Sequence, residues 1–405
     1  MASPTSIPTL AELDRLVASP FQKLSALLDG IAPGAEPINF SLGEPQGALP
    51  EFVAPVLNET MADFTRYPPI RGTADLRSAI ATWLGQRYPT LKGEIGADTH
   101  VLALNGSREG LFSAIFPARA RRADVETPAV LIPNPFYQAY AAAAVAGGAE
   151  PVFLDSEAET GFLPDLDALS DDLLDRTIVL YLCSPSNPQG AVADGAYWEK
   201  AVKLARKHDF LLFADECYSE IYTEEPPEGA LEVAFAANGG FSNVLSFNSL
   251  SKRSGLPGLR SGFIAGDSEF LASFGRFRNV ACPQTPLPLQ AVATTAWADE
   301  AHVAAGRRIY AENFDVADEI LGDCFGYQRP QGGFFLWLDM SAAGGGEAAA
   351  KTLWKVCGVK VLPGGYLARE DFNGRNPGQD HVRVALVHGP AVTREGLARI
   401  VTTLG

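Results

Sequence analysis

The sequence predicts an α/β fold with a mostly parallel, seven-stranded sheet in a large domain, followed by a smaller α+β domain. Seven short apolar runs lie between residues 101 and 267, and helical segments such as AYWEKAVKLARKHD separate them. Runs that are apolar throughout indicate strands that helices cover on both faces. After residue 288 the pattern changes to long helical stretches with isolated strand-like segments, which favours a second, smaller domain.

The expected elements of the sheet follow one another along the chain in a regular order. We expect strands at 101–106, 129–134, 150–155, 177–185, 210–217, 243–250 and 261–267. In the smaller domain, GGFFLWLDM and HVRVALVH predict strands, and the segments around them predict helices. The expected domains are an N-terminal arm packing on the small domain (1–45), a large domain (46–288) and a small domain (289–405).

Composition argues against several classes of protein. The formal net charge of −16 disfavours nucleic acid or an anionic membrane surface as a partner. The five cysteines are widely spaced without a CxxC pair, which indicates reduced thiols rather than a metal site or disulfides. The first residues predict no signal peptide, and no apolar run is long enough to span a membrane. We therefore expect a cytoplasmic protein without a metal.

Polar and charged side chains gather where the predicted strands end, which is where open parallel sheets bind ligands. The first strand is followed by Ser107 and Arg108 at a predicted helix start, a place that can bind an anion. Later strands end in SPSNPQG, ADECYSEIY and SLSKRSGLPGLRSGF, which contribute Asn187, Asp215, Tyr218, Ser249, Lys252 and Arg260. Each motif alone is also typical of an ordinary turn or helix cap. Together they offer an anion cradle, a buried carboxylate, hydroxyl and amide donors, and a lysine.

This combination matches what pyridoxal 5′-phosphate (PLP) requires of a protein. The aldehyde of PLP needs a lysine, its ring nitrogen needs a carboxylate, and its phosphate needs cationic and N–H donors. A lysine close to an arginine and a cationic cofactor has a lowered pKa, as a nucleophile and general base requires. The sequence therefore predicts a PLP site in which Lys252 is the reactive amine.

From SLGEP (41–45) to HVRVAL (381–386), these ordered motifs resemble the class I/II aminotransferases of PLP-dependent transferase fold type I. The resemblance implies that Lys252 attaches the cofactor and shuttles a proton, and that Asp215 pairs with the ring nitrogen. Asn187 and Tyr218 are the implied hydrogen-bond partners of the cofactor's 3-oxygen. The implied phosphate ligands are Ser107, the backbone of Arg108, Ser249 and Arg260.

Other implied roles concern the substrates, an amino acid and a 2-oxo acid, and a second subunit. Tyr137 occupies the position that stacks on the cofactor ring. Arg383 resembles the arginine that binds the substrate α-carboxylate, beside Asn187 and the backbone of Gly43. Tyr67 resembles the tyrosine that reaches the phosphate of a neighbouring subunit, which implies a homodimer with shared active sites.

Two Asn-Pro pairs lie at predicted strand ends. The resemblance implies sharp bends there, so we expect cis peptide bonds at Asn134-Pro135 and Asn187-Pro188. Around the second pair, NPQG replaces the NPTG that is usual in the family. Gln189 is expected to matter little because Asn187 is kept.

Several stretches, among them PFQKLSALLDGIAP and NPFYQAY, are similar to the succinyldiaminopimelate aminotransferases of bacterial lysine biosynthesis. This similarity implies transfer of an amino group between N-succinyl-L,L-diaminopimelate and 2-oxoglutarate. Such a donor carries three carboxylates, of which Arg383 neutralises one. Arg71 is the leading candidate for binding the distal carboxylates and Arg278 is the second. Either arginine could instead form an ion pair at an interface or on the surface.

Other functions remain open because they use the same residues. Transamination of aspartate or another amino acid, and the β-elimination of a C–S lyase, need the same cofactor contacts. A non-enzymatic PLP-binding regulator is disfavoured because no basic helix-turn-helix segment precedes the fold. The glycine-rich GGGEAA at 344–349 resembles a dinucleotide-binding loop, but it lies outside the predicted parallel sheet, which favours an ordinary loop.

Overall fold

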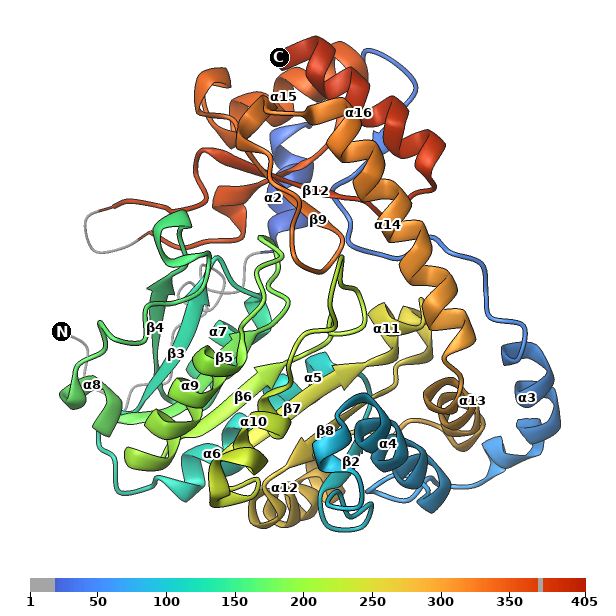
Figure 1. The fold of residues 1–405 in the computed structure, drawn as a ribbon, viewed down its shortest axis with the longest axis vertical. Helices are drawn as coiled ribbons and strands as arrows, with labels where there is room; N and C mark the ends of the chain where they lie inside the picture. The colour runs from blue at the N-terminus through green and yellow to red at the C-terminus, as the bar shows by residue number, and fades with distance from the viewer. Residues whose placement is uncertain (1–18, 371–373) are drawn as a thin grey trace.

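A seven-stranded sheet dominates the structure, a computed structural model that describes residues 19–370 and 374–405 (Figure 1). The strand order is β2-β8-β7-β6-β5-β3-β4. All neighbours are parallel except β8, which is antiparallel to β2 and β7. Each strand falls within a range predicted from the sequence: β2 (Val101–Leu104), β3 (Ala129–Asn134), β4 (Glu150–Asp155), β5 (Thr177–Cys183), β6 (Leu211–Asp215), β7 (Val244–Ser249) and β8 (Gly262–Gly266). The predicted mostly parallel sheet is confirmed.

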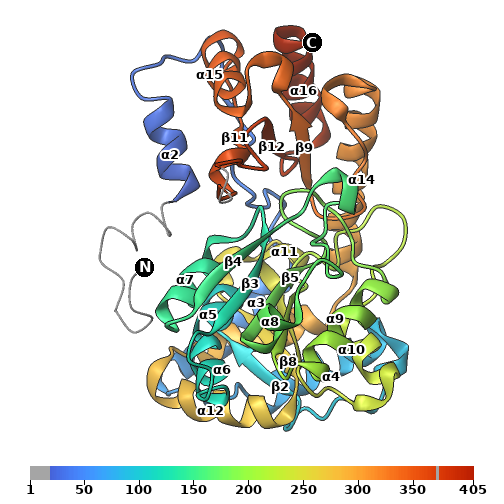
Figure 2. The same cartoon turned by 90° about the vertical axis from the view of Figure 1, so that its left-hand side faces the viewer.

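Helices cover both faces of this sheet (Figure 2). One face carries α4 (Ala74–Arg87), α9 (Gly195–Lys207), α10 (Ala230–Ala234) and α13 (Leu287–Ala298). The other face carries α5 (Ser107–Ser113), α6 (Ile115–Arg121), α7 (Gln138–Ala146) and α12 (Ser268–Ala281). In β2, Val101 and Ala103 belong to the core on the first face, and Leu102 and Leu104 to the core on the second. Because both faces are buried, most positions of the central strands are apolar, with polar residues mainly near the strand ends and in β7.

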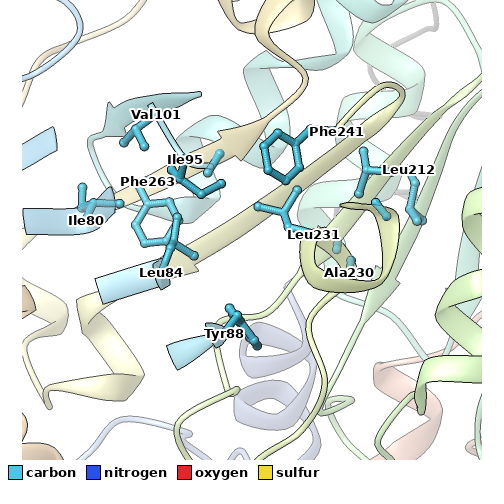
Figure 3. Close-up of a cluster of buried hydrophobic side chains, with 14 of the residues drawn as sticks. Ile80, Leu84, Tyr88, Ile95, Val101, Leu212, Ala230, Leu231, Phe241 and Phe263 are labelled. Carbon is cyan, nitrogen blue, oxygen red and sulfur yellow. The ribbon is translucent and has the colours of Figure 1, made fainter. Parts of the chain in front are cut away.

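The core on the first face holds α4 firmly against the sheet. Figure 3 shows Ile80 and Leu84 of α4 beside Phe263 of β8. The ring centroids of Trp83 and Trp297 lie 4.8 Å apart, which joins α4 to α13. Full burial of one large apolar side chain contributes about 1.5–3 kcal/mol, so this cluster fixes the position of α4.

Side-chain caps decide where two of the covering helices begin. The carboxylate of Asp194 accepts a hydrogen bond from Tyr197 N at 2.8 Å at the start of α9. At the start of α12, Asp267 accepts one from Phe270 N at 3.0 Å. These bonds satisfy N–H groups that have no partner within the helix, so Asp is favoured at both positions.

A smaller unit is built on a three-stranded sheet in the order β11-β12-β9, above the large sheet in Figure 1. Its strands are β9 (Phe335–Asp339), β11 (Leu362–Pro363) and β12 (His381–Ala385). Its helices are α14 (Ala301–Leu321), α15 (Gly346–Cys357) and α16 (Pro390–Leu404), with α14 and α15 both packing on α16. The predicted α+β character of the C-terminal part is confirmed. GGGEAA begins α15 and lies outside the seven-stranded sheet, as expected.

The described part of the N-terminal arm packs on this smaller unit, and residues 1–18 of the arm lie outside the described ranges. β1 (Ile38–Asn39) pairs in parallel with β10 (Val359–Lys360). Leu24 of α2 (Pro20–Leu27) clusters with Leu362 of β11. The remaining α-helices within the described ranges are α3 (Val53–Thr60), α8 (Asp171–Asp175) and α11 (Leu250–Arg253).

The domain boundaries at 45 and 288 stay a prediction. α13 packs against α3 and α4, beside the large sheet, whereas α14 packs against α16 of the smaller unit. We therefore propose that the large domain includes all of α13 and that the small domain begins with α14.

Candidate active site

A cavity of about 320 Å³ lies where the carboxyl ends of the large sheet meet the smaller unit. The smaller unit contributes Phe335, Leu367 and Arg383 to its lining. Of the site residues proposed from the sequence, all except Tyr67, Arg71 and Arg278 line this cavity: Gly43, Ser107, Arg108, Tyr137, Asn187, Asp215, Tyr218, Ser249, Lys252, Arg260 and Arg383. The fold thus brings together side chains that are far apart in the sequence.

Asp215 is the last residue of β6, and its carboxylate is buried with 5% exposure. It accepts a hydrogen bond from the hydroxyl of Tyr140 at 2.6 Å and a longer one from Cys217 N at 3.3 Å. Burial raises the pKa of Asp215, while the hydrogen bonds from Cys217 and Tyr140 lower it. A buried carboxylate in this setting is stabilised by a cation placed against it.

Lys252 lies on α11, directly after β7, and its Nζ donates to the carbonyl oxygen of Gly43. The ammonium also lies 5.4 Å from the ring centroid of Phe334 and 5.9 Å from that of Tyr218. Burial, with the nearby charge of Arg383, lowers the pKa of Lys252 to about 8. Near neutral pH this amine can therefore lose a proton more readily than a surface lysine.

Arg383 reaches the cavity from β12, at the junction of the two units. Its guanidinium is 4% exposed and donates to Asn187 Oδ1 at 3.1 Å and to the carbonyl oxygen of Ser41 at 2.8 Å. Nε is buried and meets no acceptor among the described residues. Burial lowers the pKa of Arg383 to about 10, so the group still carries its charge near neutral pH. A buried arginine with hydrogen-bonding capacity to spare is suited to a carboxylate ligand.

The other end of the cavity gathers donors for an anion. Ser107 begins α5, and Ser249 caps α11, where its Oγ accepts from Ser251 N at 3.2 Å. The Arg260 side chain lies against Gly106, so that a Cβ at residue 106 would be 2.1 Å from Arg260 Nη2. Gly106 also has a φ of +83°, and both facts require glycine there. Two hydroxyl groups and a guanidinium that line the same end of a cavity can bind a phosphate.

Two tyrosines form part of the cavity wall. Tyr137 precedes α7, and its hydroxyl accepts a hydrogen bond from Arg108 Nε. Tyr218 follows β6 and packs edge-on against Phe335, with ring centroids 5.7 Å apart. Burial raises the pKa of Tyr218 well above its usual value, so its hydroxyl stays protonated and can donate a hydrogen bond.

Tyr67 and Arg71 lie outside the cavity of their own chain. Tyr67 is fully exposed, with a relative accessibility of 101%. Arg71 donates from Nη2 to the carbonyl oxygen of Val101 at 3.0 Å, at the start of β2 and therefore away from the strand end that faces the cavity. The expectation that Arg71 binds distal carboxylates stays a prediction, and this contact speaks against it.

The suggestion that Arg278 binds substrate is wrong. Its guanidinium is 1% exposed and makes two hydrogen bonds of 2.5 Å to the carboxylate of Glu109. The charge is therefore already paired inside the fold, which is the ion-pair alternative that the sequence left open.

Sequence reasoning missed three groups that the fold places at the site. Tyr140 supports Asp215, the Ser41 carbonyl supports Arg383, and the Cys217 thiol donates to Ser107 Oγ at 3.2 Å. Of these groups, only Tyr140 could have been found from the sequence, because it follows the proposed ring-stacking residue Tyr137 by three positions, in the first turn of α7.

The peptide bonds at Asn134-Pro135 and Asn187-Pro188 are both cis, as predicted. Ser184-Pro185 is a third cis bond that the sequence analysis did not foresee. Gln189, which sequence reasoning gave little weight, is buried with 8% exposure and lines the cavity.

The chemistry of these side chains fits PLP. Asp215 offers a buried carboxylate for a protonated ring nitrogen, and Lys252 offers an amine with a lowered pKa. Arg260 offers a guanidinium that packs against Gly106, where only glycine leaves room for it. The described residues contain no cluster of His, Cys, Asp and Glu that could bind a metal. None of the helices in the described ranges is long and apolar enough to cross a lipid bilayer. The fold and site define a PLP-dependent enzyme.

The chain belongs to the family of class I and II aminotransferases, whose sequence model matches residues 35–401. The crystal structure of an aminotransferase from Neisseria meningitidis Z2491 is 37% identical in sequence, with a TM-score of 0.91, covering 97% of this chain and 99% of that one. An LL-diaminopimelate aminotransferase from Syntrophobacter fumaroxidans is 29% identical over 387 residues, or 94% of this chain and 95% of the relative. A probable N-succinyldiaminopimelate aminotransferase from Thermus thermophilus is 26% identical, with a TM-score of 0.79, covering 97% and 99% of the two chains. The protein is thus a PLP-dependent aminotransferase that acts on amino acids and 2-oxo acids.

Proposed function

We propose that this aminotransferase moves the amino group between N-succinyl-L,L-diaminopimelate and 2-oxoglutarate. The observation that carries the proposal is an apolar part of the cavity lining, formed by Pro20, Phe21, Leu42, Phe162 and Leu163. The amide nitrogen of an acylated amine has no charge and can lie against such side chains, while the succinyl carboxylate and the distal α-carboxylate of the donor need polar or cationic partners elsewhere. A free distal ammonium would need a carboxylate beside it.

Few carboxylates are available for that purpose. Among the described residues that line the cavity, they are Asp215, at the end of β6, and Glu44, which is exposed. Since Asp215 is the group that would face the cofactor ring, only Glu44 could serve a free ammonium. This favours the acylated donor over unacylated L,L-diaminopimelate, which is the second candidate.

The names of similar proteins support the substrate class. The relative from Syntrophobacter fumaroxidans is described as acting on LL-diaminopimelate, and the one from Thermus thermophilus as probably acting on N-succinyldiaminopimelate. Both names point to diaminopimelate, and they differ in the acyl group. The apolar lining is the reason for preferring the succinylated form here.

Different residues of the cavity would have different roles in the reaction. PLP, when bound, withdraws electrons from the α-carbon of the amino acid and so makes its proton acidic. Lys252 would hold the cofactor and, as an amine with a pKa of about 8, would take and return that proton. Asp215 would keep the ring nitrogen protonated, and Asn187 and Tyr218 would hydrogen-bond the 3-oxygen. Arg383 binds the substrate α-carboxylate through two N–H groups.

The anion end of the cavity would hold the cofactor phosphate through Ser107, Ser249 and Arg260. Tyr67 would add a ligand from a second subunit, because it is exposed and outside the cavity of its own chain. We therefore propose a homodimer in which each chain completes the site of the other.

A donor panel tests the substrate. The purified holoenzyme is assayed for glutamate formed from 2-oxoglutarate with N-succinyl-L,L-diaminopimelate, L,L-diaminopimelate, L-aspartate and cysteine. We expect the highest kcat/KM with the succinylated donor, and no activity with any donor in Lys252→Ala. Higher kcat/KM with L,L-diaminopimelate or L-aspartate would replace the proposal, and pyruvate release from cysteine would indicate a lyase.

A further inference from the structure

Residues 156–164, which follow β4, form one wall of the cavity, and we call this segment the β4 wall. It includes Phe162, which has a φ of +60°, a left-handed conformation that is unfavourable for a bulky side chain. The backbone N–H of Phe162 donates to Glu157 O at 2.7 Å and closes a tight turn. Such a conformation persists only where its surroundings hold it. Four of its residues face the cavity: Ser156, Phe162, Leu163 and Pro164.

Two side-chain hydrogen bonds hold the ends of the β4 wall. At one end, Gln189 Nε2 donates to the carbonyl oxygen of Ser156 at 3.3 Å. At the other end, the hydroxyl of Tyr197, on α9, donates to the carbonyl oxygen of Pro164 at 2.8 Å. Gln189 lines the cavity and Tyr197 does not. The wall is therefore held by Gln189 from inside the site and by Tyr197 from outside it. In addition, Ser156 N donates to the carbonyl oxygen of Asn134 at 2.9 Å, and Glu157 forms an ion pair with Arg375.

Gln189 also connects the wall to the turn that carries Asn187. Its amide is buried, and its Oε1 accepts from Ser186 Oγ at 3.5 Å. The same Ser186 hydroxyl accepts from Ala191 N at 3.0 Å, which closes the turn on itself. The Gln189 amide thus has partners on both the wall and the turn, and the turn that carries Asn187 is closed by Ser186 without it.

We propose that the β4 wall selects amino donors by the length of their side chains. We further propose that Gln189 is the positioning residue that holds this wall. Phe162 and Leu163 lie in the segment that Gln189 anchors, and both line the cavity. A long donor must extend beyond the α-carboxylate held by Arg383 and contact the wall, whereas a short donor ends before it. This inference rests on the proposed aminotransferase site, and it does not depend on the succinyl group.

The test compares Gln189→Met, which keeps the length of the side chain and removes the N–H donor, with Tyr197→Phe, which frees the other end of the wall. Tyr327→Phe is the matched control, because it removes a 2.6 Å hydrogen bond to Asp318 in the smaller unit, and Tyr327 does not line the cavity. The holoenzymes are assayed with N-succinyl-L,L-diaminopimelate as the long donor and L-aspartate as the short one. The absorbance of the bound cofactor is followed from pH 6 to 9.

We expect KM for the long donor to rise about threefold to tenfold in Gln189→Met and Tyr197→Phe, the effect of one lost hydrogen bond. Its kcat, the KM for L-aspartate and the cofactor spectrum should stay unchanged, and Tyr327→Phe should match the unmodified enzyme. Equal changes for both donors, or no change in either variant, would overturn the proposal. An effect of Gln189→Met that Tyr197→Phe does not reproduce would mean that Gln189 touches the donor directly, and would also overturn it.

Failure of the proposed substrate can be told apart from failure of this inference. If the unmodified enzyme does not use the succinylated donor, L-2-aminoadipate replaces it as the longer partner of L-aspartate. The difference between the two donors then still reports on the wall. If Gln189→Met does not fold, Gln189→Asn, which is too short to reach Ser156, takes its place.

Discussion

Replacing Lys252 by methionine should stabilise the cofactor-free protein below pH 8. The native site lowers the pKa of this amine from 10.5 to about 8, chiefly by burial and then by the charge of Arg383. The protonated form is therefore less favourable in the folded protein than in the unfolded one. This difference corresponds to about 3 kcal/mol against folding at pH values where the amine is protonated in both states.

The sign of the pH dependence follows from which state binds the proton more strongly. Below pH 8 both states are protonated and the full destabilisation is present. Between pH 8 and 10.5 the folded protein has lost the proton while the unfolded chain keeps it, so the unmodified protein becomes more stable as the pH rises. Lys252→Met removes this titration and also the hydrogen bond to Gly43, which offsets about 1 kcal/mol. The net gain below pH 8 is about 2 kcal/mol; it falls as the pH rises and becomes a loss of about 1 kcal/mol near pH 10.5, where only the missing hydrogen bond remains.

Urea unfolding of the cofactor-free proteins between pH 6 and 10, at one fixed protein concentration, measures this effect. Lys351→Met, at an exposed position of α15, is the control and should show no such dependence. A Lys252→Met protein that is less stable than the unmodified one at pH 7, or a difference that does not change with pH, would refute the reasoning.

Three further predictions concern turnover and assembly. Asp215→Asn should keep the cofactor but lower kcat by about 10²-fold, or about 3 kcal/mol, because a neutral amide does not keep the ring nitrogen protonated; normal turnover would show that another group does so. Arg383→Lys should lower kcat/KM by about 10²-fold with every amino donor, since a single ammonium replaces two charge-assisted hydrogen bonds, and a loss confined to one donor would contradict this role. Mixing inactive Tyr67→Ala and Lys252→Ala proteins should restore some activity in hybrid dimers, and a fully active monomer would disprove the shared site.

The sequence by itself determined the strands and the groups at their ends. Each strand of the large sheet is a short, mostly apolar run between polar turns, because helices bury both faces of the sheet. Such a run can be recognised from the sequence alone. Lys252 and Asp215 follow such runs directly, so their place at the edge of the sheet could be predicted from their neighbours in the chain. The two cis Asn-Pro bonds were predicted from the family resemblance, since each lies in a short motif that carries it.

Tertiary structure alone decided how distant groups meet. Asn187 and Arg383 are 196 positions apart, and their 3.1 Å hydrogen bond exists because the smaller unit packs over the ends of the large sheet. The burial of Gln189 and the hydrogen bond from Tyr140 to Asp215 likewise depend on contacts between segments that no local pattern connects. The pKa of Lys252 has the same origin, because desolvation is a property of the assembled site and not of the residue.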